Sequence, residues 1–95
     1  MIDIREDSAG DPLAFTVTIR EGKGETRHNV TMAKADFSRL SGGRHAPAEV
    51  IDAAVRFLLD REPKESILAR FDVSVIARYF PEFQRELPCC LKTSA

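Results

Sequence analysis

The sequence predicts an α+β fold in which an N-terminal three-stranded antiparallel meander packs against a C-terminal helical layer of one long helix and several short ones. Apolar residues alternate with polar ones between residues 2 and 32, as in half-buried strands. From residue 33 onward the apolar residues recur with a helical spacing. The chain has 95 residues, of which 43% are apolar and 31% charged, as is typical of a globular domain. We therefore expect a single α+β domain over residues 1–88 and a flexible tail over residues 89–95.

Two turn signals divide the first 32 residues into three strands. Ile2 and Ile4 alternate with charged residues before a turn at residues 9–12, and a glycine-containing loop at residues 21–24 separates the next two strands. A hairpin centred on Gly22 and Lys23 places one set of side chains on a common face. The expected pairs are Leu13 with Met32, Phe15 with Val30, Val17 with His28 and Ile19 with Thr26. A slip of one residue would mix the two faces, so the hydrophobic pattern fixes this register.

The long helix is expected in the middle of the chain. A short helix over Lys34–Leu40 is ended by Gly42, because glycine is the usual residue just past a helix C-terminus. Pro47 suits the first position of the next helix, which we predict over Pro47–Arg61. The polar residues of this helix form one narrow stripe, made of Glu49, Asp52, Arg56 and Asp60. So narrow a stripe indicates a helix that is packed on more than one side.

Prolines divide the rest of the chain into short helices. We expect a helical turn over Lys64–Ala69 and then a helix capped by Asp72 or Ser74. A last turn is predicted over Glu82–Leu87, and Pro88 closes it.

Charge and composition argue against several classes of protein. Lys plus Arg is 14 and Asp plus Glu is 15, whereas a nucleic-acid-binding domain usually has a net basic face. The acidic N-terminus is typical of neither a signal nor a transit peptide, and the apolar runs are too short to cross a bilayer. Cys89 and Cys90 are neighbours, and a disulfide between them would close almost no chain. We expect a cytoplasmic protein that does not contact a membrane.

One segment has some resemblance to a helix-turn-helix motif. Residues 66–86 contain a Leu-Ala pair, a turn and a second helix, so Arg70, Arg78 and Arg85 are candidate nucleic-acid contacts. The turn is one residue shorter than the usual pattern and has no glycine. The second helix is largely apolar, whereas base reading requires several polar or basic groups. Nucleic-acid binding is therefore the alternative prediction, and a helical corner of the core is the preferred one.

A second candidate site lies before the long helix. Gly42, Gly43, Arg44 and His45 lead into its N-terminus, where free backbone N–H groups and the helix dipole favour an anion. The spacing matches no phosphate-binding fingerprint. The alternative interpretation is an exposed connecting loop.

The sequence contains no arrangement typical of a metal site or of a catalytic centre. The two histidines and the two cysteines lack metal-ligand spacing. Four carboxylates alternate with basic residues as in a solvated corner linked by salt bridges: Asp60, Glu62, Glu65 and Asp72. We predict a protein that is not an enzyme and that uses no metal or cofactor.

Interaction with another protein is the function that we favour from the sequence. The edges of a three-stranded meander can add a strand from a partner or from a second copy. Four aromatic residues could be wholly core or partly a docking patch: Phe71, Tyr79, Phe80 and Phe83. The prediction is a non-catalytic interaction or regulatory module with a protein partner or a homodimer.

The second half of the chain also resembles a known sequence pattern. Phe57–Leu68 reads FLLDREPKESIL and is followed by Phe71 and by Tyr79–Phe83, which reads YFPEF. These strings are similar to FLLxREPKESIL…F…I…YFPE(Y/F) near the C-termini of a small family of uncharacterised bacterial proteins. The resemblance implies a bacterial cytosolic protein. It assigns a role to no residue.

Overall fold

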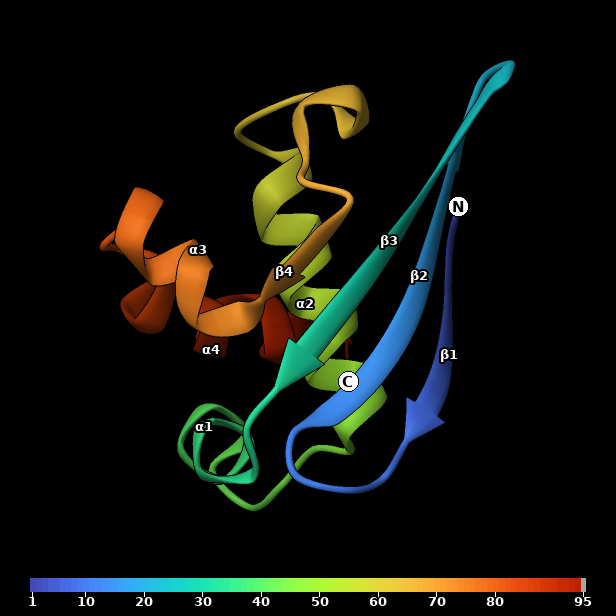
Figure 1. The fold of residues 1–95 in the computed structure, drawn as a ribbon. Helices are drawn as coiled ribbons and strands as arrows, with labels where there is room; N and C mark the ends of the chain where they lie inside the picture. The colour runs from blue at the N-terminus through green and yellow to red at the C-terminus, as the bar shows by residue number, and fades with distance from the viewer. Residues whose placement is uncertain (95) are drawn as a thin grey trace.

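The computed structural model describes residues 1–94, with side chains for residues 1–87 and 91. It is an α+β fold with a four-stranded mixed sheet in the order β1-β2-β3-β4. In chain order the elements are β1 (Ile2–Ser8), β2 (Leu13–Glu21), β3 (Gly24–Met32), α1 (Lys34–Ser41), α2 (Pro47–Leu59), the 3₁₀ turn η1 (Lys64–Ser66), β4 (Arg70–Asp72), α3 (Val73–Tyr79) and α4 (Phe83–Ser94). Helix α2 lies behind the sheet and packs against α4 (Figure 1).

The predicted hairpin register is confirmed. Strands β2 and β3 pair Leu13 with Met32, and the pairing continues in step to Glu21 and Gly24. All the side chains that this register places on the inner face of β2 are buried. On the outer face Arg20 lies opposite Glu25, and its Nε donates a hydrogen bond of 2.8 Å to Oε1. Strand β1 also pairs with β2 in an antiparallel direction, with Ile2 beside Ile19.

The sheet contains a fourth strand that the sequence analysis missed. Strand β4 runs parallel to β3, and the Asn29 amide donates to the Ala69 carbonyl at 2.8 Å. The Thr31 hydroxyl donates to Oδ1 of Asp72 at 2.6 Å across the same pair of strands. We predicted a helical turn as far as Ala69, whereas the 3₁₀ turn η1 ends at Ser66. The strand buries Phe71 between two polar residues, an alternation too short to be told from a turn.

Asp72 links this strand to α3. Its carboxylate accepts hydrogen bonds from the Ser74 amide at 3.0 Å and from Thr31, which confirms it as the helix cap. Burial tends to raise the pKa of Asp72, but the Thr31 hydroxyl and the Ser74 amide hold it below its ordinary value of 3.8. The stabilisation that this carboxylate provides is therefore present above that value and is lost as the pH falls through the lower pKa of the folded state.

We expect Asp72→Ala to lower the free energy of unfolding by about 0.5–2 kcal/mol at pH 7, the usual cost of removing a helix cap. Urea denaturation followed by circular dichroism measures the difference. The difference in the free energy of unfolding between parent and variant should become smaller as the pH is lowered from 5 to 2, because protonation of Asp72 weakens the helix cap of the parent. Asp72→Asn, which keeps a capping oxygen but cannot titrate, is the control. If this difference in free energy stays constant down to pH 2, the ionised form of the Asp72 carboxylate is not the source of the stabilisation.

The predicted starts and stops of the first two helices hold to within two residues. Gly42 ends α1 in the left-handed conformation with φ 61°, and Pro47 is the first residue of α2. Helix α2 ends at Leu59, two residues before the predicted end at Arg61. Seven of its thirteen residues are buried, as the narrow polar stripe predicts: Val50, Ile51, Ala53, Ala54, Val55, Phe57 and Leu58.

The structure contradicts the prediction for the last residues of the chain. We expected the last turn to stop at Pro88 and a tail to follow, whereas α4 continues to Ser94 and is nearly as long as α2. Phe83, Leu87 and Leu91 follow one another at a spacing of four, and all three are buried. The burial of this apolar face offsets the cost of a proline inside a helix, which is about 3 kcal/mol for a lost backbone hydrogen bond and a clash with the preceding turn. Residue 95 and the side chains of Cys89 and Cys90 lie outside the described part, and with them the predictions made for the two cysteines.

Candidate functional site: an apolar groove beside β4

A groove of about 350 Å³ opens between the segment that follows α2 and helix α3. Its floor and walls come from four separate parts of the chain. The apolar side chains that line it include Leu58, Leu68, Phe71, Val75, Tyr79 and Phe80. Most of these residues belong to the loop between α2 and β4 and to helix α3, which Figure 1 shows on the side of β4 away from β3.

The groove holds two of the three large hydrophobic side chains that are exposed in the described part of the chain. Among the residues with described side chains, the large hydrophobic ones that are exposed are Met1, Leu68 (51%) and Tyr79 (70%), and the last two line this groove. The four aromatic residues singled out in the sequence therefore divide. Phe71 and Phe83 are core, Phe80 is half-buried, and Tyr79 is on the surface.

One carboxylate adds charge to this apolar surface. Glu62 lines the groove and is half-buried, and its side chain makes no hydrogen bond or ion pair with another described residue. The nearby Glu65, in contrast, accepts a bond of 2.6 Å from Lys64 Nζ. The remaining polar lining residue is Ser66. The groove thus presents an apolar surface with one negative charge that is available to a bound group.

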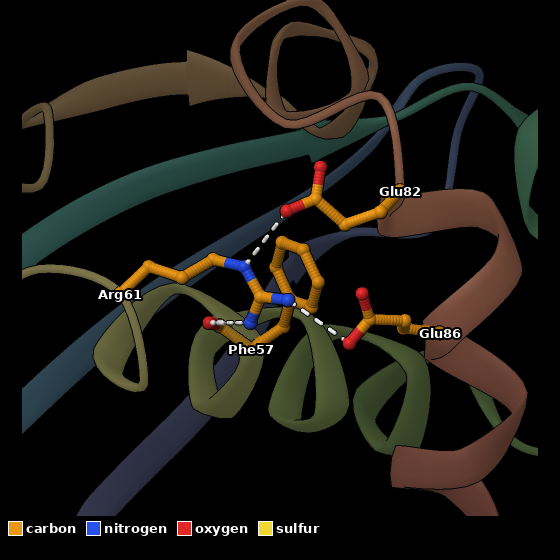
Figure 2. A network of polar contacts seen from close by, with 4 residues as sticks. All are labelled: Phe57, Arg61, Glu82 and Glu86. Carbon is orange, nitrogen blue, oxygen red and sulfur yellow. Dashed lines mark hydrogen bonds and ion pairs between the residues drawn. The ribbon is translucent and has the colours of Figure 1, made fainter.

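Arg61 precedes the groove residue Glu62 and links the end of α2 to the start of α4. Its guanidinium lies 3.6 Å from the centre of the Phe57 ring and donates to Glu82 at 3.3 Å and to Glu86 at 2.9 Å (Figure 2). It also donates to the Phe57 carbonyl at 3.2 Å. Burial alone would lower the pKa of Arg61, but the hydrogen bonds that it donates to Glu86 and Glu82 raise it. This arginine therefore holds the start of α4 against the last turn of α2.

His28 ties the Leu68 wall of the groove to the sheet. The predicted register places His28 opposite Val17 on the inner face of β3, and it is buried there. Its Nδ1 lies 2.7 Å from the Leu68 carbonyl and its Nε2 lies 2.9 Å from the Thr26 hydroxyl. Because a carbonyl can only accept, Nδ1 carries the proton and donates. The backbone of Leu68 is thus tied to the sheet while its side chain is exposed in the groove.

The predicted anion site is partly occupied by the chain's own carboxylate. Glu49 accepts a hydrogen bond of 2.9 Å from the Ala46 amide at the start of α2, and its other oxygen is 3.5 Å from His45 Nδ1. These contacts, the Ala46 amide first, lower the pKa of Glu49. The amide of Gly43 donates to the Ser41 hydroxyl at 3.1 Å. An anion here would have to displace Glu49, and binding at Gly42, Gly43, Arg44 and His45 stays a prediction.

The helix-turn-helix interpretation of residues 66–86 is wrong as a structure. The part expected to be the first helix is the end of η1, an extended segment and β4. The three arginines lie on three different elements. Arg70 is on β4, Arg78 on α3 and Arg85 on α4, and all three are exposed.

The four carboxylates considered for acid–base chemistry have separate surroundings. Glu65 is bound to Lys64, Asp72 caps α3, Glu62 lines the groove and Asp60 ends α2. Among the side chains that are described, no three His, Cys, Asp or Glu residues come together in a way that could hold a metal ion. Within residues 1–94, no helix is long and apolar enough to cross a bilayer.

No protein-family model matches the chain, and neither a curated protein nor a solved structure matches it.

Proposed function

We propose that this chain is a non-catalytic protein-interaction module whose groove binds a short segment of a partner protein. The segment carries apolar side chains and one basic residue. The observation that supports this most directly is that Leu68 and Tyr79 are both exposed on the walls of the same groove. Exposed apolar side chains that gather in one concave place are typical of binding surfaces.

The electrostatics of the groove select the chemistry of the partner. Glu62 is the charged residue in the lining, and its carboxylate has no partner among the described side chains. A lysine or arginine of the bound segment would pair with it in surroundings of low polarity, where a charge-assisted hydrogen bond is stronger than in water. An acidic segment would be repelled at the same place.

The surroundings of the groove keep its shape before a partner arrives. His28 holds the backbone of Leu68, and Arg61, which precedes the groove residue Glu62, is held by Glu82 and Glu86. A surface that is already ordered loses less conformational entropy on binding. We therefore expect the unbound chain to present the same groove as the bound one.

A selection from a random peptide library displayed on phage tests this proposal. We expect panning against the immobilised chain to enrich peptides with apolar residues and a Lys or Arg. Leu68→Glu should weaken the binding of these peptides at least tenfold, because it places a charge in the apolar groove. Fluorescence anisotropy with synthetic copies of the enriched peptides measures the change.

The control is Ser38→Glu, which adds the same side chain at an exposed position of α1 outside the groove. Both variants should unfold at the temperature of the parent. No enrichment, or enriched peptides that bind Leu68→Glu as well as the parent, would contradict the proposal.

Nucleic-acid binding is the alternative function. The observation in its favour is that Arg70, Arg78 and Arg85 make no ion pair with any residue whose side chain is described. Backbone phosphates bind such arginines in a strongly salt-dependent way. If neither DNA nor RNA shifts in a gel at low salt, this alternative is removed.

A further inference from the structure

We infer that the partner segment binds as an extended strand that adds to the free edge of β4. Its alternate side chains enter the groove. The inference rests on the proposed function and specifies the backbone conformation and the residue pattern of the partner. It follows from the direction of the β4 backbone, from the exposure of its edge and from the two charges beside it.

The backbone of β4 has one set of groups free to pair. The Asn29 amide donates to the Ala69 carbonyl, and the registered pairs are Asn29 with Arg70 and Val30 with Phe71. In a parallel ladder of this register, the N–H and C=O of Phe71 point to β3. Those of Arg70 point the other way, out of the sheet. They are the groups that an added strand would bond.

The edge beside Arg70 is open to a partner. Leu68, Ala69 and Arg70 are all exposed, and β4 is the last strand of the sheet on this side. The opposite edge is β1, whose exposed residues include the charged run Arg5, Glu6 and Asp7. Charged side chains along an edge discourage the addition of another strand. Strand β4 also carries two charged residues, but the Asp72 carboxylate is bound by the Thr31 hydroxyl and the Ser74 amide. Phe71 of β4 lines the apolar groove, whereas no residue of β1 does, so β4 is the edge suited to pairing.

The groove lies on the side of the sheet to which every second residue of an added strand would point. Phe71 is buried on the helical side of β4 and lines the groove. Residues i and i+2 of a neighbouring strand point to this same side. Two apolar residues at that spacing would meet Leu68 and Tyr79, and a basic residue two further along would reach Glu62.

The intervening residues would lie on the other face of the sheet. Arg70 projects to that face because side chains alternate along a strand and Phe71 points to the helices. Its guanidinium makes no ion pair with a described side chain. An acidic residue of the partner, placed between the two apolar ones, would lie beside it. The expected pattern is apolar, acidic, apolar, polar, basic.

Two peptides of this pattern test the inference, one for each strand direction. They are acetyl-Thr-Leu-Asp-Leu-Thr-Lys-Thr-amide and the same sequence reversed, acetyl-Thr-Lys-Thr-Leu-Asp-Leu-Thr-amide. The matched control, acetyl-Thr-Leu-Leu-Asp-Thr-Lys-Thr-amide, has the same composition but places its two leucines on opposite sides of a strand. We expect one of the first two to bind and the control to bind at least tenfold more weakly, as measured by titration of the ¹⁵N-labelled chain.

Backbone pairing has its own readout. The exchange of the Arg70 amide with solvent should slow at least tenfold when the peptide is bound. N-methylation of alternate residues of the peptide should weaken binding, and N-methylation of the residues between them should not. Glu62→Lys should prefer a peptide with Glu in place of Lys. These effects do not require any change in the fold of the chain.

Three results would overturn the inference. The first is that neither patterned peptide binds although library-selected peptides do bind in the groove, which would leave the proposed function intact. The second is that a peptide binds while Arg70 exchange and the N-methylation series show no effect. The third is a dimer in light scattering that Leu68→Glu dissociates, because the occupant would then be a second copy. Failure of the library selection itself would instead contradict the proposed function.

Discussion

Phe57→Ala should lower the free energy of unfolding by about 3–5 kcal/mol, the range for truncation of a buried aromatic residue. Phe57 is almost completely buried on α2. Its ring packs edge-on against Phe83 at 5.0 Å and against Phe80 at 5.9 Å between ring centres. The ring also supports the guanidinium of Arg61. Truncation therefore leaves a cavity and also removes the surface on which a partly buried charge rests.

Urea denaturation of parent and variant measures this loss. The slope of the free energy of unfolding against urea concentration should be compared between the two. The matched control is Phe80→Ala, which removes a half-buried ring from the same cluster and should cost clearly less. Phe57→Leu should recover most of the stability, because it refills much of the volume. A loss below about 1 kcal/mol for Phe57→Ala would be that of a surface position and would show that the core is misplaced.

Leu91→Ala should cost about 2–5 kcal/mol, although Leu91 lies four residues from the end of the chain. The residue is 3% exposed and continues the apolar face that Phe83 and Leu87 begin. Helix α4 packs with this face on α2. The loss of the leucine should also loosen the Arg61 contacts, because Glu82 and Glu86 belong to the start of the same segment.

The control for Leu91→Ala is Leu68→Ala, the same chemical change at a residue that is 51% exposed. In thermal and urea unfolding, Leu91→Ala should be much less stable than Leu68→Ala. If residues 89–95 were the flexible tail that the sequence suggests, the two would have similarly small effects. Equal stabilities would therefore contradict the docking of α4.

The meander could be predicted from the sequence because its signal is local and repeated. Eight consecutive residues of β2 alternate, and β3 alternates in step across a short loop, so one register alone buries all the large apolar residues of the hairpin. The start of α2 was predictable for a similar reason. A proline at the first position and a glycine after the preceding helix both act through the backbone of their own segment.

The other elements depend on contacts between distant segments. Strand β4 has three residues, too few to show a period, and it is a strand because β3 offers it an edge. Pro88 indicated a helix end, but the spacing of Phe83, Leu87 and Leu91 was the stronger signal and was overlooked. A proline affects the local backbone only, so its presence does not indicate whether the residues after it pack on another part of the fold.

The groove could not be predicted for a further reason. Its walls come from α2, the loop after it, β4 and α3, so no single motif describes it. Leu68 looks like a core residue in the sequence because it stands between Ile67 and Ala69, and the sequence leaves open whether Tyr79 is core or docking surface. Only the packing shows that the core is full without them. Arg61 is one of the basic residues that alternate with the carboxylates of the predicted solvated corner, whereas its partners Glu82 and Glu86 lie 21 and 25 residues away.

The parallel position of β4 also has a consequence for the order in which the chain folds. Residues of β3 and β4 that touch, such as Thr31 and Asp72, are 41 positions apart, whereas the β2–β3 hairpin closes through a loop of two residues. Closing a long loop is entropically costly and therefore slow. The hairpin can thus form early, and the edge of β3 that later pairs with β4 stays unpaired until α1 and α2 have folded. During that interval, in a cell or in a refolding experiment, the unprotected side of β3 is where one chain is most exposed to pairing with another.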